Sequence, residues 1–220
     1  MTFRHSLALA MAAFLTLSSL PARPAVLGVV VAADRVHLNT TAVTAGATIY
    51  DGDRFSTEAG GSLRVRIGAA MLELAGASVV SVRNRTNSAQ GMEVELDNGT
   101  LVFSSARAAS LNVIARETNI RPVADTRTVA QIIVTGRKEL RICARRGAVQ
   151  FSYRGETETL AEGECYRVIL DPPKNSPKEN EPIPPGHWPK GFKIVIIGEA
   201  AAVVGLGIQE LLESESPYRP

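Results

Sequence analysis

Short segments in which apolar and polar residues alternate make up most of the chain. Leu63, Val65 and Ile67, for example, alternate with serine and arginine. Because successive side chains of a strand point to opposite faces, this period of two predicts strands with one buried face. Such segments follow one another at intervals of roughly ten residues through 26–170, and no long segment there has the period of a helix. The pattern predicts an all-β fold, an antiparallel β-sandwich or roll of short strands.

Three turn signals divide this pattern. Asp34–Arg35 follows the apolar run 26–33 and is expected to end the first strand. Asp51–Gly52 supplies a residue that tolerates a positive φ just before the strand that begins at Arg54. Asp97–Gly99 reads Asp-Asn-Gly between two alternating segments, which is the strongest hairpin signal in the chain. We therefore predict a turn at each position and, at the last of them, a β-hairpin.

The N-terminal residues have the pattern of a secretory signal peptide. Arg4 and His5 precede Leu7–Leu17, an apolar run without a charge, and Ala22 offers a small residue for cleavage. The competing interpretation is an uncleaved membrane anchor, for which the apolar run is short. We predict that residues 1–25 are a signal peptide and that the chain is exported to the periplasm or cell envelope.

The C-terminal part differs in composition from the rest of the chain. Residues 171–191 are dense in proline and charge, which predicts an extended linker. Residues 192–212 are mostly apolar and predict a single hydrophobic helix, followed by a tail at 213–220. That helix is a candidate transmembrane anchor in the inner membrane, although Glu199 within it would cost about 2.5–3.5 kcal/mol in a bilayer. A surface helix or a self-associating helix is the alternative.

Composition narrows the class of partner. The chain has 220 residues, a formal net charge of +2 and only 5% aromatic residues. It therefore has neither the strong basic stripe of a nucleic-acid-binding protein nor the aromatic platform on which single-stranded bases stack, and we expect no nucleic-acid partner. Once both ends are set aside, the length leaves one domain, residues 26–170.

The two cysteines are candidates for a disulfide. Cys143 and Cys165 both lie in predicted strands, and an oxidising compartment would allow them to pair. The bridge would stabilise the fold by about 3 kcal/mol in the chain-entropy model. Two unpaired strand cysteines are the alternative. The three histidines, His5, His37 and His187, are scattered without metal-ligand spacing, so we expect no metal site.

Candidate catalytic groups are sparse. Asp51 and Asp53 form the best carboxylate pair and could bind Ca²⁺ or carry out acid–base chemistry, but a tight turn is the favoured interpretation, because turns select Asp and Gly. Ser56 and Thr57 have no histidine near them in the sequence, and His37 stands alone in a strand. We therefore predict that the protein is not an enzyme and uses no cofactor.

A series of short motifs, mostly turn residues, follows a recognisable order. Residues 52–57 read Gly-Asp-Arg-Phe-Ser-Thr, which matches a G-D-x-hydrophobic-x-T signature, and related motifs occupy 94–101, 147–149 and 160–164. In this order, across 27–168, the chain resembles the FecR-like domain family, periplasmic sensor domains named for an iron-dicitrate regulator. The residues that carry the resemblance are Gly52, Asp53, Phe55, Thr57, Gly99, Gly147 and Gly163.

The resemblance implies an extracytoplasmic β domain that senses or binds. Family members that regulate sigma factors carry a cytoplasmic segment and a membrane helix before this domain, where we expect a signal peptide in this chain. Our hypothesis is a non-enzymatic sensing and binding module of the cell envelope, with a small ligand or an envelope protein as its partner and residues 192–212 as an anchor. The alternative is a structural envelope protein that self-assembles through sheet edges or its C-terminal helix.

Overall fold

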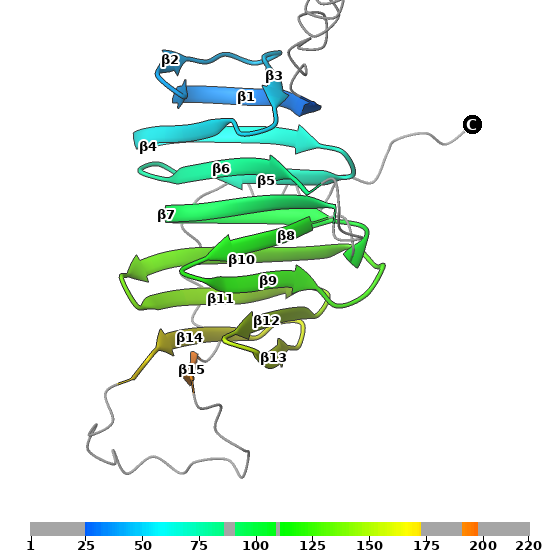
Figure 1. The fold of residues 1–220 in the computed structure, drawn as a ribbon, viewed down its shortest axis with the longest axis vertical. Coiled ribbons are helices and arrows are strands. Elements are labelled where there is room, and N and C mark those ends of the chain that lie inside the picture. The colour runs from blue at the N-terminus through cyan, green and yellow to red at the C-terminus, as the bar shows by residue number, and fades with distance from the viewer. Residues whose placement is uncertain (1–24, 86–90, 109–110, 173–190, 198–220) are drawn as a thin grey trace, which may run out of the picture.

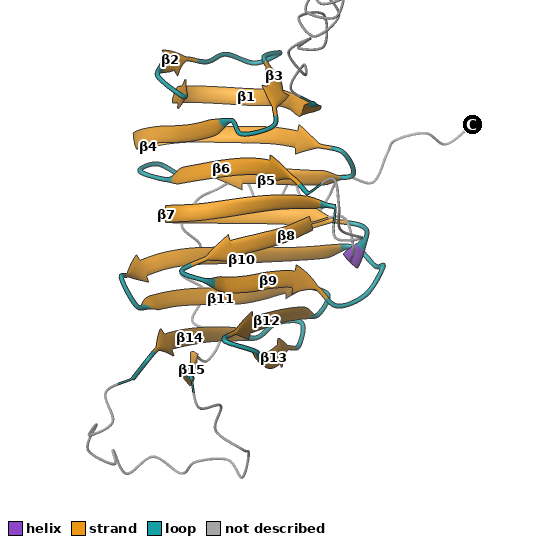
Figure 2. Ribbon diagram, in the orientation of Figure 1, coloured by secondary structure: helices purple, strands orange, loops and turns teal. Residues whose placement is uncertain are grey.

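A computed structural model describes residues 25–85, 91–108, 111–172 and 191–197, and most of these residues are β-strand (Figures 1 and 2). Their hydrogen bonds join them into one network of 15 strands. The strands are β1 (Val26–Leu38), β2 (Thr41–Ala42), β3 (Thr48–Tyr50), β4 (Arg54–Ile67), β5 (Ala70–Leu74), β6 (Val79–Asn84), β7 (Met92–Ser105), β8 (Leu111–Ala115), β9 (Thr118–Pro122), β10 (Thr128–Gly136), β11 (Glu139–Arg146), β12 (Val149–Tyr153), β13 (Glu156–Leu160), β14 (Cys165–Leu170) and β15 (Phe192–Ile197). The all-β prediction is confirmed.

The network folds into two layers because β7 belongs to both. Its first half pairs with β6 and β8, whereas its second half pairs with β5 and β10. Layer A continues from β10 through β11 and β14 to β15, and layer B continues from β8 through β9 and β12 to β13. β4 likewise pairs with β6 at one end and β5 at the other, so β1 and β4 close the sandwich at its N-terminal end (Figure 1). Among the described strands only the β7–β8 pair is parallel.

The alternating segments of the sequence supply the inner faces of both layers. Side chains at paired positions form rows across each layer, and the apolar members of these rows are almost completely buried in one common core. Each buried Val, Leu, Ile or Phe side chain contributes about 1.5–3 kcal/mol of hydrophobic stabilisation. One such row crosses layer B through Val82, Val94, Val113, Ile120 and Phe151.

Two of the predicted turns are wrong, because the chain bulges there without reversing. β7 runs straight through Asp97–Gly99, and Asp97 is the extra residue between the pairs Val80–Leu96 and Val79–Asn98. β1 similarly continues past Asp34–Arg35, where its register with β4 shifts. Bulges and hairpin turns both require residues that tolerate a positive φ, so their sequence signals are the same. The turn predicted at Asp51–Gly52 is present.

These bulges lie against one another at a corner where the strands pass between layers. A Cβ on Gly61 would stand 2.7 Å from the Arg35 carbonyl oxygen, and one on Gly76 would stand 2.5 Å from the Gly60 nitrogen. At Gly99 the distance to the Ser78 hydroxyl would be 2.3 Å. We call Gly61, Gly76 and Gly99 the glycine corner, since the close backbone approach there excludes any side chain.

The predicted C-terminal helix is wrong over its first six residues. Phe192–Ile197 form β15, which pairs antiparallel with β14 across the linker. Phe192 is buried and its ring lies 5.1 Å from the ring of Phe151. A short apolar run is compatible with either a strand or a helix. Here the run forms a strand because it can pair with the open edge of β14. The signal peptide, most of the linker and residues 198–220 lie outside the described residues.

No helix in the described part of the chain is long and apolar enough to cross a membrane.

Candidate functional site

The motif at residues 52–57 builds a turn and anchors it to the core. Gly52 has a φ of +87°, which explains the glycine. The Asp53 carboxylate accepts hydrogen bonds from the Tyr50 backbone N–H at 2.8 Å and from the Asn39 amide at 3.3 Å. Phe55 is fully buried. These residues therefore shape and hold the β3–β4 turn.

Thr57 and Gly99 meet at the glycine corner through Ser78. The Thr57 hydroxyl donates to the Ala75 carbonyl at 2.5 Å and accepts from the Ser78 N–H at 2.9 Å. The Ser78 hydroxyl donates to the Thr100 carbonyl at 3.2 Å and accepts from the Thr100 N–H at 2.9 Å. Ser78 is completely buried, and its bonds satisfy backbone groups of Thr100, which lies beyond the last β6–β7 pair, Val79–Asn98.

Gly147, Gly163 and the cysteines lie together near the far end of the sandwich. The Gly147 N–H donates to the Glu162 carboxylate at 2.9 Å, and Gly163 forms a turn with a φ of +87°. Cys143 and Cys165 occupy directly opposed positions of β11 and β14, with Cα atoms 4.1 Å apart, and are joined by a disulfide. The seven motif residues are thus spread over several turns and do not converge on one ligand site.

The candidate catalytic residues also serve the backbone or lie on an open face. The Asp51 carboxylate accepts from the Asn84 backbone N–H at 2.8 Å. The structure does place His37 directly opposite Ser56, a proximity that the sequence spacing did not suggest. His37 approaches Glu58 at 3.7 Å, but no hydrogen bond joins it to Ser56 in this part of the sheet. Among the described residues, no group of His, Cys, Asp and Glu is arranged to hold a metal ion.

A cleft lies at one end of the sandwich, among turns of both layers. It has a volume of about 340 Å³ and lies between the β8–β9 and β12–β13 turns of layer B and the β10–β11 turn of layer A. We call it the turn cleft. Its lining residues are Glu95, Leu96, Asp97, Ile114, Arg116, Glu117, Arg137, Lys138, Tyr153, Arg154, Leu170 and Asp171.

The turns around this cleft hold charged residues in an unfavourable backbone conformation. Arg116 and Glu117 have φ values of +49° and +62°, Arg154 has +51° and Asp171 has +46°. A two-residue hairpin requires positive φ at such positions, and Asn or Gly normally supplies it. A residue with a Cβ costs about 1–2 kcal/mol there. Four of the seven non-glycine residues with positive φ in the described chain thus lie around this cleft, which makes it a candidate functional site.

One carboxylate already occupies part of the turn cleft. The Asp171 oxygens lie 2.7 Å from the Arg154 guanidinium and 3.5 Å from the Lys138 ammonium group. The Tyr153 hydroxyl donates to the same carboxylate at 3.1 Å. Burial raises the pKa of Tyr153, and the hydrogen bond to Asp171 raises it further, so the phenol remains a donor. The cleft therefore presents a complete set of donors to a carboxylate.

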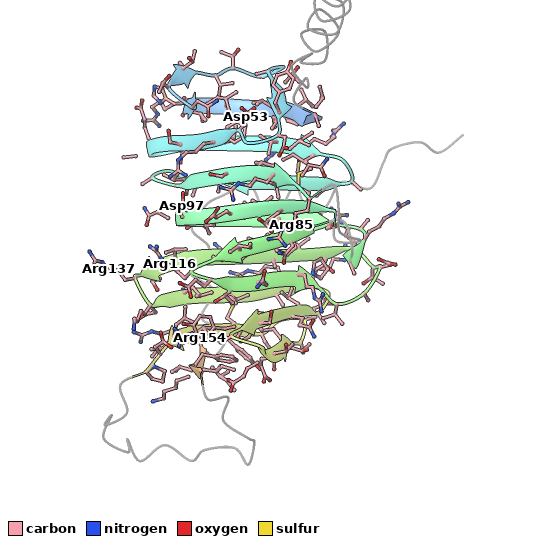
Figure 3. All side chains as sticks on the ribbon, viewed as in Figure 1. Asp53, Arg85, Asp97, Arg116, Arg137 and Arg154 are labelled. Carbon is pink, nitrogen blue, oxygen red and sulfur yellow. A yellow bond between two sulfur atoms is a disulfide. The ribbon has the colours of Figure 1, made fainter. Side chains whose placement is uncertain are left out.

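Two other arginines of the cleft have no carboxylate partner in the described structure. Arg116 donates to the Gly136 carbonyl at 3.1 Å, and Arg137 makes neither an ion pair nor a hydrogen bond with any described residue. Both lie on the side of the molecule that carries Asp97 and, lower down, Arg154 (Figure 3). The acids of β7 are engaged elsewhere, since Asp97 pairs with Arg54 at 2.6 Å. An anion entering the cleft would therefore meet two arginines that form no ion pair with any described residue, with Glu117 as an opposing charge in the lining.

A second hollow, of about 400 Å³, lies along β9 and β12. It differs from the turn cleft in the partners of its arginine. Its arginine, Arg121, donates twice to the Gln150 side chain, at 2.6 and 2.9 Å. Because this guanidinium already has a partner within the sheet, the hollow offers a ligand fewer unsatisfied donors than the turn cleft does.

Sequence reasoning missed the turn cleft because its residues come from turns far apart along the chain. The available signal was local: Arg116–Glu117 and Arg154 stand between alternating segments where turn residues were expected. Recognising that these turns converge requires the strand order of both layers.

No protein-family model and no curated protein matches this chain. Two crystal structures of a candidate anti-sigma factor from Parabacteroides distasonis resemble it, with 16% and 15% sequence identity and TM-scores of 0.44 and 0.45. Each match covers 53% of this chain, which spans about half of the other protein, 54% of its length. A likeness this remote carries no argument about function.

Proposed function

We propose that this protein is a non-enzymatic binding and sensing module of the cell envelope, and that its turn cleft binds a small ligand bearing carboxylate or phosphate groups. The observation that carries the proposal is the pair Arg116 and Arg137, which line a cleft of strained turns without a carboxylate partner among the described residues. Guanidinium groups bind both kinds of anion with two parallel hydrogen bonds, which favours this ligand class.

Asp171 supports the same ligand class from within the protein. Its carboxylate lies among a guanidinium, an ammonium and a phenol, all supplied by the cleft. A ligand carboxylate or phosphate would meet the same chemistry at Arg116 and Arg137. The cleft volume of about 340 Å³ suits a small molecule better than a folded partner.

Binding tests this proposal directly. Isothermal titration of the purified chain with succinate and with inorganic phosphate is expected to give saturable binding to at least one of them. Arg137→Gln should weaken it about tenfold, since a hydrogen bond to a charged group is worth about 1.5–3 kcal/mol. The matched control is Arg121→Gln, which removes an arginine from the second hollow and should leave the affinity unchanged. Equal losses in both variants, or no binding of either anion, would contradict the proposal.

Export and anchoring belong to the same proposal. The signal-peptide pattern of residues 1–25 and the order of the FecR-like motifs support a periplasmic location. Because β15 belongs to the folded domain, a C-terminal membrane anchor would have to begin after Ile197. Cell fractionation with a carbonate wash, comparing the full chain with one that ends at Ile197, tests this. Release of the shortened chain alone would support an anchor in residues 198–220, and release of both would exclude it.

A structural envelope protein that self-associates is the second candidate function. The observation that favours it is the apolar edge strand β15, where Ile196 is 61% exposed.

A further inference from the structure

The described sandwich has several edge strands, and they differ in how they are protected. β2 and β3 are only 2 and 3 residues long, and short edges offer little to a pairing strand. β13 carries Glu156 and Glu158, which oppose edge-to-edge pairing by charge. β15 reads Phe-Lys-Ile-Val-Ile-Ile, so its single charge is Lys193. Of these edges, β15 is the one without effective protection.

β15 also continues the core face of layer A to the open edge of the sheet. One inward row of paired residues crosses layer A and reaches Ile196 through Tyr166 of β14. Every other member is at most 8% exposed, whereas Ile196 is 61% exposed. The members that precede it are Leu63, Leu74, Leu101, Ile132, Ile142 and Tyr166. The row thus continues onto an apolar position that no described residue covers.

The strand itself is held firmly at its other end. Phe192 is buried against Phe151 of layer B, and the Gly191 N–H donates to the Glu156 carboxylate at 3.0 Å. The position of Ile196 therefore belongs to a docked strand, and its exposure is that of an apolar side chain at the open edge of layer A.

We propose that two copies of this chain pair through their β15 strands, antiparallel and about a twofold axis. This arrangement places the same strand on both sides of the interface, so each copy supplies the apolar cover that the other requires. The charge of Lys193 favours antiparallel over parallel pairing of the two strands. A parallel, in-register pair would place the two Lys193 ammonium groups side by side, whereas an antiparallel pair places each lysine near the opposite end of its partner strand. The layers A of the two copies then form one continuous sheet.

Sedimentation of the purified full chain over a wide range of concentration tests this proposal. The wild type is expected to convert from monomer to dimer as concentration rises. Ile196→Lys should raise the dimer dissociation constant about tenfold or more, because it places a charge on the interface, and it should fold normally because the site is exposed. Val123→Lys is the matched control, since Val123 is 47% exposed in the β9–β10 connection, away from β15.

Hydrogen exchange locates the contact independently of the variants. Amide protons of residues 193–197 should become more protected as the wild-type concentration rises, and Ile196→Lys should abolish that change. A wild-type chain that stays monomeric at every concentration would overturn the proposal. A dimer that persists in Ile196→Lys without protection of 193–197 would also overturn it, and would place the association elsewhere in the chain.

Discussion

Ser78 shows how one buried hydroxyl holds the corner of this sandwich. It bonds both backbone groups of Thr100, immediately after the residue at which β7 leaves layer B for layer A. The Cα of Gly99 lies so close to Ser78 that a Cβ there would stand 2.5 Å from the Ser78 Cα. The serine therefore replaces ladder hydrogen bonds, and the glycine gives it room.

Gly99→Ala is expected to destabilise the protein by about 3 kcal/mol or more, because it combines an unfavourable positive φ with a steric clash. Gly155→Ala is the control. Gly155 has a φ of +84° but nothing within 4 Å of an added Cβ, so the loss there should be about 1–2 kcal/mol. Urea unfolding of both variants measures the difference. Equal losses would mean that the corner is not tightly packed.

Tyr166 predicts how stability depends on alkaline pH. Burial raises its pKa to about 12 from the ordinary value of 10.0, assisted by a hydrogen bond from its hydroxyl to Glu164. The folded state thus binds the phenol proton more tightly than the unfolded chain, and stability falls as pH rises from about 10 to about 12. Ultraviolet titration of the folded protein should show late tyrosinate steps, because the pKa of Tyr153 is also raised. Tyr166→Phe should remove the step near pH 12, and a step of unchanged amplitude there in this variant would refute the assignment.

At the scale of elements, the alternating segments predicted most strands, because burial of one face dictates a period of two. The residues Asp34–Arg35 and Asp97–Gly99 misled the prediction, because a bulge inside a long strand uses the same residues as a turn between strands. β15 could not be predicted from 192–197 alone. Its conformation depends on the open edge of β14, which the sequence reveals only through long-range pairing.

The β8–β9 turn yields a prediction that separates backbone strain from charge. Glu117→Gly is expected to stabilise the protein by about 1 kcal/mol, because glycine accepts the φ of +62° without strain. It should also strengthen anion binding, because it removes a negative charge from the turn cleft. Glu117→Ala removes the same charge but keeps a Cβ, so it should improve binding without improving stability. Chemical unfolding measures the stability of both variants, and calorimetry measures their anion affinity. A stability gain in both variants would argue against backbone strain as the cause.

At the scale of the whole molecule, strand order determines which distant residues become neighbours. The turn cleft unites residues between Glu95 and Asp171 because the strand order brings the β8–β9, β10–β11 and β12–β13 turns together. The sequence motifs identified the framework around the glycine corner, including Thr57 and Gly99, and gave no direct signal for the cleft. The framework residues belong to turn motifs that can be recognised within a single segment. The cleft is assembled from several distant segments and leaves no such local motif.

The measurement that tests the central claim most directly is nuclear magnetic resonance of the isotope-labelled chain during titration with inorganic phosphate and with succinate. We predict saturable shifts of the backbone amides in the turns at 115–118, 136–139 and 153–156, together with the side-chain Nε–H signals of Arg116 and Arg137. Arg121 in the second hollow provides an internal reference that should not move. Shifts that are absent, unsaturable or spread evenly over the surface arginines would contradict the turn cleft as the binding site.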